Sequence, residues 1–114
     1  MEESQKYNLG KIIAYLESTP EDSWCTDVVK TKDGRNCVMG HIFDYGGGDL
    51  GGSDFWDFFE ACIATTFMIY GVNDGKDSDY QQPTPKQRCI AYLRDIEQGV
   101  KPSTQRLMEQ QREL

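Results

Sequence analysis

Residues 84–99 read TPKQRCIAYLRDIEQG and contain the clearest structural signal in the chain. Thr84 suits the N-cap position, Pro85 suits the first helical position, and Gln87 completes a capping box. The apolar residues that follow recur at helical spacing; they are Cys89, Ile90, Leu93 and Ile96. We therefore predict a helix with one buried face that runs to about Gln98, because Gly99 is a typical helix stop.

A second amphipathic helix is predicted over residues 8–18. Its apolar residues follow the i, i+3, i+4, i+7 spacing of one buried face; they are Leu9, Ile12, Ile13 and Leu16. Thr19 and Pro20 end this helix, because a residue that precedes proline disfavours helical geometry. Residues 21–23 are expected to form a turn.

The segment after this turn combines strand and helix signals. Residues 24–35 hold strand-forming side chains around the tight-turn signal KDG, which favours a short hairpin. Asn36 is placed to cap a helix that runs to about Tyr45. Within that helix, Gly40 would permit the close approach of another backbone or of an aromatic ring.

The middle of the chain predicts the most buried helix. Ser53 is a natural N-cap, and apolar residues occur nearly all round the helix as far as Tyr70, where Gly71 provides a stop. Two flexible loops are expected beside it, at residues 46–52, which contain five glycines, and at residues 73–83.

Together these elements predict a mainly α fold. We expect residues 1–114 to form one compact domain of four to five helices, with room for one short β-hairpin near residues 24–36. A polar C-terminal helix at residues 103–113 is expected to dock loosely. No apolar run approaches the ~20 residues that a membrane-spanning helix needs. Because the acidic N-terminus also lacks a secretory signal, we expect a cytoplasmic protein with reduced thiols.

The net charge of −7 is concentrated in one third of the sequence. Residues 44–79 hold eight acidic residues and a single lysine, so this segment alone carries −7. The remainder has eleven acidic and eleven basic residues and is neutral. An acidic field of this kind repels nucleic acid and anionic membranes and attracts basic surfaces. We therefore expect a basic protein surface as the partner, with no direct nucleic-acid contact and no membrane binding.

Aromatic side chains accompany the acids in this segment and provide the candidate partner-binding residues. These are Asp49, Asp54, Phe55, Trp56, Asp57 and Glu60. An aromatic anchor rimmed by acids is typical of a binding hot spot for a basic partner. The leading hypothesis is a non-enzymatic protein-binding module that needs no cofactor. By analogy, small acidic domains of this kind include phage-encoded inhibitors of bacterial defence systems, some of which occupy a nucleic-acid site.

Two other functions remain open from the sequence. Cys37 and His41 lie four residues apart on a predicted helix and could act as a nucleophile and its base. With Cys25 and Cys62 they could instead complete a four-ligand zinc site, although no close cysteine pair marks one. The third hypothesis is a small-ligand binding protein with its site between the helices.

Several short motifs resemble those of a small uncharacterised helical-domain family of bacteria and phages, a domain of unknown function. They are Ser23-Trp24, Asp33-Gly34-Arg35, Cys37-Val38-Met39-Gly40-His41 and Val72-Asn73-Asp74. The resemblance covers residues 24–97, and His41 departs from the small residue that usually follows the glycine in that family. It implies a compact helical domain and no assigned activity.

Overall fold

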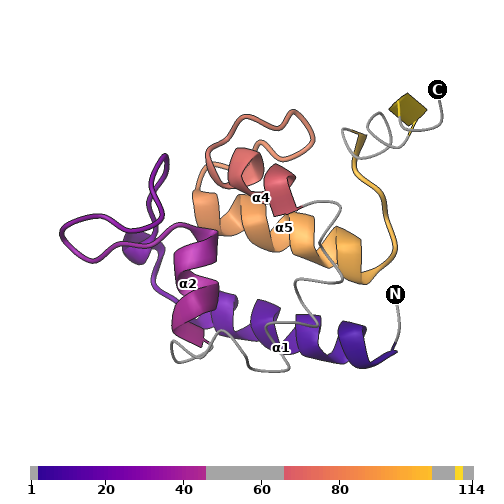
Figure 1. Cartoon of the computed structure of the whole chain (residues 1–114), viewed down its shortest axis with the longest axis horizontal. Helices are drawn as coiled ribbons and strands as arrows, with labels where there is room; N and C mark the ends of the chain where they lie inside the picture. Colours follow the sequence, from indigo (N-terminus) through magenta and orange to yellow (C-terminus); the bar gives the residue numbers. More distant parts are fainter. Residues whose placement is uncertain (1–2, 46–65, 104–109, 112–114) are drawn as a thin grey trace.

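The computed structural model describes residues 3–45, 66–103 and 110–111. In chain order the elements are α1 (Glu3–Ser18), the 3₁₀ helix η1 (Glu21–Ser23), α2 (Val38–Tyr45), α4 (Thr66–Asn73) and α5 (Pro85–Glu97). Figure 1 shows α5 between α1 and α4, with α2 packed across one end of this layer. The mainly α fold predicted from the sequence is confirmed, and the described segments form one globule around one core.

Helix α5 forms as its local sequence predicts. The Thr84 hydroxyl accepts a hydrogen bond from the Gln87 backbone N–H at 3.2 Å, and Pro85 opens the helix. Gly99 has a φ of 78° and ends the helix, with its N–H donating to the carbonyl of Ile96 at 3.1 Å. The buried face contains Tyr92 in addition to the expected residues, whereas Ile90 is only partly buried.

Helix α1 presents the expected apolar face to the core. Leu9, Ile12, Ile13 and Leu16 are all buried. The helix begins at Glu3, however, five residues before the predicted start. Its first turns are mostly polar and face solvent, so they add nothing to the apolar periodicity. They remain helical because Glu, Gln and Lys are good helix formers, and Glu3 lies near the positive end of the helix dipole.

Helix α4 continues past the glycine that was expected to end it. The prediction of a stop at Gly71 is wrong, because Gly71 lies inside the helix, which ends at Asn73. The αL residue is Gly75, with a φ of 77°. Its N–H donates to the carbonyl of Val72, and the N–H of Lys76 donates to that of Gly71, which is the Schellman arrangement. Which glycine ends a helix depends on which one can reach αL geometry with these two bonds.

Residues 24–37 form an irregular loop. The short hairpin that the sequence favoured near residues 24–36 does not form. The only pairings in this loop are isolated bridges of Asn36 with Trp24 and with Lys30. The KDG turn does form, since Gly34 has a φ of 89° and the Thr31 N–H donates to the carbonyl of Arg35. Asp27 has a φ of 70°, which breaks the extended conformation that a strand pair would require.

Three expectations lie outside the described residues. They are the glycine-rich loop at 46–52, the part of the predicted helix from Ser53 to residue 65, and residues 104–109 and 112–113 of the C-terminal helix. The start of that last helix is described at Ser103, whose backbone N–H donates to the Asp79 carboxylate at 2.7 Å.

Candidate functional site

A fully buried asparagine at the end of α4 joins three parts of the fold. The side-chain oxygen of Asn73 accepts a hydrogen bond from the Val38 N–H at 3.0 Å, and its amide group donates to the Cys25 carbonyl at 2.9 Å. Asn73 therefore caps the first turn of α2 from a distant helix and fixes the start of the 24–37 loop. A buried amide that has a partner on each side holds both segments in one geometry.

The predicted cap of α2 by Asn36 is wrong. The Asn36 amide donates to the Asp44 carboxylate at 2.8 Å, and its side-chain oxygen has no hydrogen-bond partner in the described part of the chain. Asn36 instead packs against Gly40, where an added Cβ would lie 2.7 Å from both the Asn36 side-chain oxygen and the Val29 carbonyl oxygen. The expected close approach of a backbone at Gly40 is confirmed.

Asp74 links the same loop to α4 at the surface. One of its carboxylate oxygens, Oδ1, accepts hydrogen bonds from the Asp27 N–H at 3.0 Å and from the Asn73 amide at 3.1 Å. This bond holds Asp27 in its left-handed conformation, which costs a non-glycine residue free energy. Asp27 and its acceptor Asp74 are 47 positions apart in the sequence, so the left-handed conformation of Asp27 is held by a tertiary contact.

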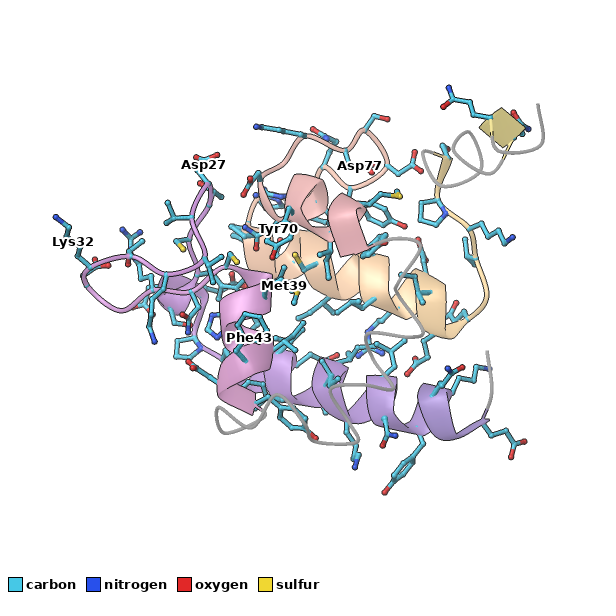
Figure 2. The ribbon with its side chains drawn as sticks, in the orientation of Figure 1. Asp27, Lys32, Met39, Phe43, Tyr70 and Asp77 are labelled. Atoms are coloured by element: carbon cyan, nitrogen blue, oxygen red, sulfur yellow. The ribbon has the colours of Figure 1, made fainter. Side chains whose placement is uncertain are left out.

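A groove opens between this loop and α4. It has a volume of about 240 Å³ and is lined by Asp27, Val28, Val29, Cys37, Tyr70 and Asp74. Figure 2 shows Asp27 and Tyr70 on the two segments that border it. Val28, Val29 and Tyr70 are unusually exposed for such side chains, at 51%, 42% and 39%. Within the described ranges, neither Asp27 nor Asp74 is in an ion pair. The groove is therefore apolar inside and carries two aspartates at its rim.

The thiols near this groove are buried. Cys37 lines it with only 2% of its surface exposed, and Cys25 and Cys89 lie in the core. Burial, followed by the influence of nearby Cys37, raises the pKa of the Cys25 thiol. Burial also raises the pKa of Cys89 strongly. Cys25 and Cys89 are thus protonated at neutral pH, the form in which a thiol is neither a nucleophile nor a metal ligand.

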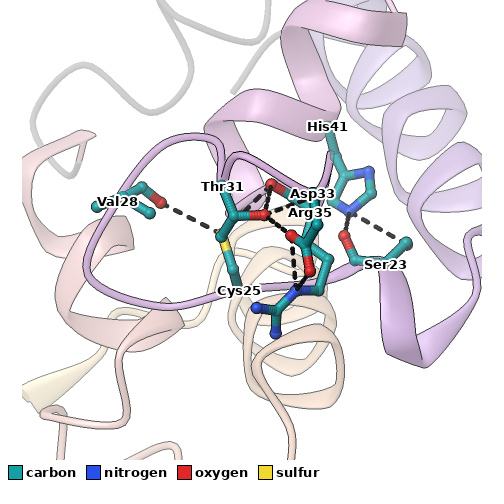
Figure 3. Close-up of polar contacts among 7 residues, drawn as sticks. All are labelled: Ser23, Cys25, Val28, Thr31, Asp33, Arg35 and His41. Carbon is teal, nitrogen blue, oxygen red and sulfur yellow. Dashed lines mark hydrogen bonds and ion pairs between the residues drawn. The ribbon is translucent and has the colours of Figure 1, made fainter.

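The imidazole of His41 faces the turn before the loop. Its ring packs against Trp24 in a tilted arrangement, with ring centroids 4.5 Å apart. Its Nε2 atom lies 3.1 Å from the Ser23 carbonyl oxygen (Figure 3). Because a carbonyl only accepts, Nε2 carries the proton in this contact. The Ser23 hydroxyl donates to the Pro20 carbonyl at 2.6 Å. Burial lowers the pKa of His41, so the ring is a neutral group that ties α2 to η1.

The candidate catalytic and metal residues are only partly brought together. The hydrogen bonds described for the His41 ring go to Ser23, and none joins it to Cys37. Across the described residues, no group of three or more His, Cys, Asp or Glu side chains is placed to hold a metal ion. Cys62 lies outside those residues, as do the proposed partner-binding residues Asp49, Asp54, Phe55, Trp56, Asp57 and Glu60.

Of the residues that line the groove, only Cys37 was singled out from the sequence, and for a different role. Asn73 and Asp74 were noted within the family-like motif and Asp74 as one acid of the segment 44–79, but neither was assigned a structural role, and nothing local marks Asp27 as a left-handed residue. In the structure, residues from three of the four motifs of the resemblance contact one another. Ser23 and Trp24 contact His41, and Asn73 contacts Val38.

Comparison with known proteins yields no relatives for this arrangement. No protein-family model matches the chain, and neither does any curated protein or solved structure. Among the described helices, none is long and apolar enough to cross a membrane.

Proposed function

We propose that this protein is a non-enzymatic binding module that engages a basic protein surface. The observation that carries the proposal is the groove beside α4, in which exposed Val28, Val29 and Tyr70 are bordered by Asp27 and Asp74. Apolar and aromatic side chains surrounded by charged groups are typical of interaction sites, and the acidic rim favours a basic partner.

The distribution of charge along the sequence supports the same proposal. Asp74 belongs to the acidic segment at residues 44–79, which carries the whole net charge of −7. A localised acidic field steers a basic partner toward this part of the chain and raises the rate of encounter. The candidate residues at 49–60 would extend the contact along the same segment.

Binding is favoured over catalysis by the state of the cysteine and histidine side chains. The candidate nucleophile Cys37 is only 2% exposed, and the ring of His41, its candidate base, is engaged with Ser23 rather than with Cys37. The groove volume of about 240 Å³ is also below the ~300–1,000 Å³ that small-molecule sites usually need. It suits a side chain of a partner protein better than a small ligand.

A more specific version of the proposal concerns inhibition. A basic protein surface is often a nucleic-acid site, so an acidic module that covers it would compete with phosphates. This is the mode of action expected of a phage-type inhibitor of a bacterial defence protein. The partner should then lose nucleic-acid binding when this module is added in stoichiometric amount, which a filter-binding assay with the purified partner would measure.

The proposal is tested by partner capture followed by measurement of affinity. The immobilised chain is used to purify its partner from native host extract, and the dissociation constant of the purified pair is measured at several salt concentrations. Two charge-removing variants are compared with the natural chain: Asp27→Asn with Asp74→Asn, and Asp54→Asn with Asp57→Asn and Glu60→Gln. The control is Glu21→Gln with Asp22→Asn, which removes two exposed charges on η1.

At least one of the two variants should weaken binding by about tenfold or more and reduce its salt dependence. The control should bind within about twofold of the natural chain, because exposed charges remote from an interface contribute little. Affinities and salt dependences that are the same for all four proteins would overturn the proposal.

A further inference from the structure

We propose that the groove beside α4 receives the side chain of an arginine from the partner protein. The inference rests on the proposed binding function and names the group that the groove recognises. It follows from the shape of the groove, from the carboxylate oxygens that remain available at its rim, and from the position of Tyr70.

The apolar part of the groove suits the aliphatic portion of a long basic side chain. Val28 and Val29 contribute apolar surface from the loop, and Tyr70 contributes an aromatic ring from α4. Arginine and lysine both bury their methylene groups along such surfaces while their charged ends reach polar groups. A groove of about 240 Å³ is of the size for one side chain.

The rim offers two acceptor atoms to a cation. Asp74 uses Oδ1 to hold the Asp27 N–H and the Asn73 amide, and Asp27 uses Oδ2 to accept from the Thr26 hydroxyl at 3.2 Å. The second oxygen of each carboxylate has no hydrogen bond in the described part of the chain. The carboxylates of Asp27 and Asp74 therefore lie near each other, and each has one oxygen available to accept a hydrogen bond.

Arginine matches these groups better than lysine does. A guanidinium is planar and has five N–H donors in a fixed fork, so it can bond to two carboxylates while it stacks on an aromatic face. An ammonium is a compact charge that stacks less well and binds water more strongly. The Tyr70 ring beside Asp74 thus favours the guanidinium.

Among the described residues, the guanidiniums of the protein near this groove are engaged elsewhere. Arg88 donates to the carbonyls of Val72, Asn73 and Gln82, and Arg35 is paired with Asp33. Lys32 lies at a projecting turn of the loop at residues 24–37, away from Asp27 and Tyr70 (Figure 2). No arginine in the described part of the chain is therefore free to fill the groove, and we expect the guanidinium from the partner protein.

The backbone hydrogen bonds allow the charge to be removed without changing the shape. Asp74→Asn keeps an Oδ1 acceptor for the Asp27 N–H, and asparagine is one of the few residues that tolerate the φ of 70° at position 27. The double variant Asp27→Asn with Asp74→Asn should therefore keep the loop in place and lose only the two negative charges.

The inference is tested by NMR titration of the full chain with three blocked tripeptides, acetyl-Ala-Arg-Ala-amide and its lysine and citrulline counterparts. Citrulline keeps the shape of arginine without its charge. The arginine peptide should shift the amide signals of Val28, Val29, Tyr70 and Asp74. It should bind about threefold or more tighter than the lysine peptide, and the citrulline peptide should bind at least ~10-fold more weakly.

The variants should separate the two contributions. The double asparagine variant should weaken arginine binding by about tenfold, and Tyr70→Leu by about threefold. The Glu21→Gln with Asp22→Asn control should stay within about twofold. The dispersion of the amide spectrum in each variant shows that the fold is retained. Equal binding of arginine and citrulline peptides, shifts away from the groove, or an unchanged double variant would overturn the inference.

The outcome also separates this inference from the proposed function. If the arginine peptide does not bind the groove although the double variant weakens capture of the partner, the binding function stands and the arginine site is rejected. If the peptide binds as expected but partner affinity is insensitive to both sets of acidic substitutions, the arginine site stands and the proposed function is rejected.

Discussion

Asn73, the last residue of α4, accepts the hydrogen bond of the Val38 N–H at the start of α2, 35 positions earlier in the chain. A helix start usually takes this bond from a side chain in its own N-cap region. Here α2 receives this hydrogen bond from α4. Because Asn73 also holds the Cys25 carbonyl, α2, α4 and the loop at residues 24–37 should unfold together.

Replacement of Asn73 by alanine should be strongly destabilising. The substitution leaves the Val38 N–H and the Cys25 carbonyl without their partners inside the protein. We expect the free energy of unfolding to fall by about 2–4 kcal/mol, because buried polar groups that lose their partners carry the full desolvation cost. Urea unfolding followed by circular dichroism measures this loss. Lys32→Ala at the exposed loop tip is the control, and an equal effect of the two substitutions would contradict the prediction.

Two of the helical glycines, Gly40 and Gly71, should respond in opposite directions to alanine. At Gly40 the new Cβ would lie 2.7 Å from the Val29 carbonyl oxygen, so we expect a loss of about 1–3 kcal/mol. At Gly71 no atom of another element in the described part of the chain lies within 4 Å of the new Cβ, and alanine should stabilise α4 by about 0.5–1 kcal/mol. Thermal unfolding of both variants tests the pair, and a gain at Gly40 would show that Val29 does not pack against α2.

The stability of the protein should fall as the pH decreases through the range of histidine titration. Burial lowers the pKa of His41 below its ordinary value of 6.5, so the unfolded state takes up a proton that the folded state resists. The stabilisation is therefore complete above the unfolded pKa and is lost as the pH falls toward the folded pKa. His41 is the only histidine in the chain, so the NMR signal of its ring reports the folded pKa directly. A folded value above 6.5 would contradict the prediction.

The thiols should react slowly while the protein is folded. Cys25, Cys37 and Cys89 are buried, and burial raises the pKa of Cys25 and Cys89. Labelling with iodoacetamide, resolved residue by residue by mass spectrometry, should be at least ~10-fold slower in the folded protein than in urea at all three positions. Fast labelling of Cys37 in the folded state would favour the cysteine-dependent enzyme over the binding module.

The sequence by itself determined the elements whose signals are local. The apolar face of α1 and the whole of α5, from the Thr84 cap to Gly99, follow from interactions between residues three to five positions apart. Such interactions are readable in any short window of the chain. The mainly α class followed from the same signals, and the error at Gly71 arose because two nearby glycines both fit a helix stop.

The tertiary structure alone decided the groove. Asp27 meets Asp74 across 47 positions, and Tyr70 lies beside Val28 only because Asn73 fixes the loop against α4. The φ of 70° at Asp27 goes with a hydrogen bond from its N–H to Asp74, 47 positions away, which no short window of the sequence contains. The sequence placed negative charge in one third of the chain. The packing of α4 against the loop placed one of those charges, Asp74, beside Asp27 at the rim of an apolar groove.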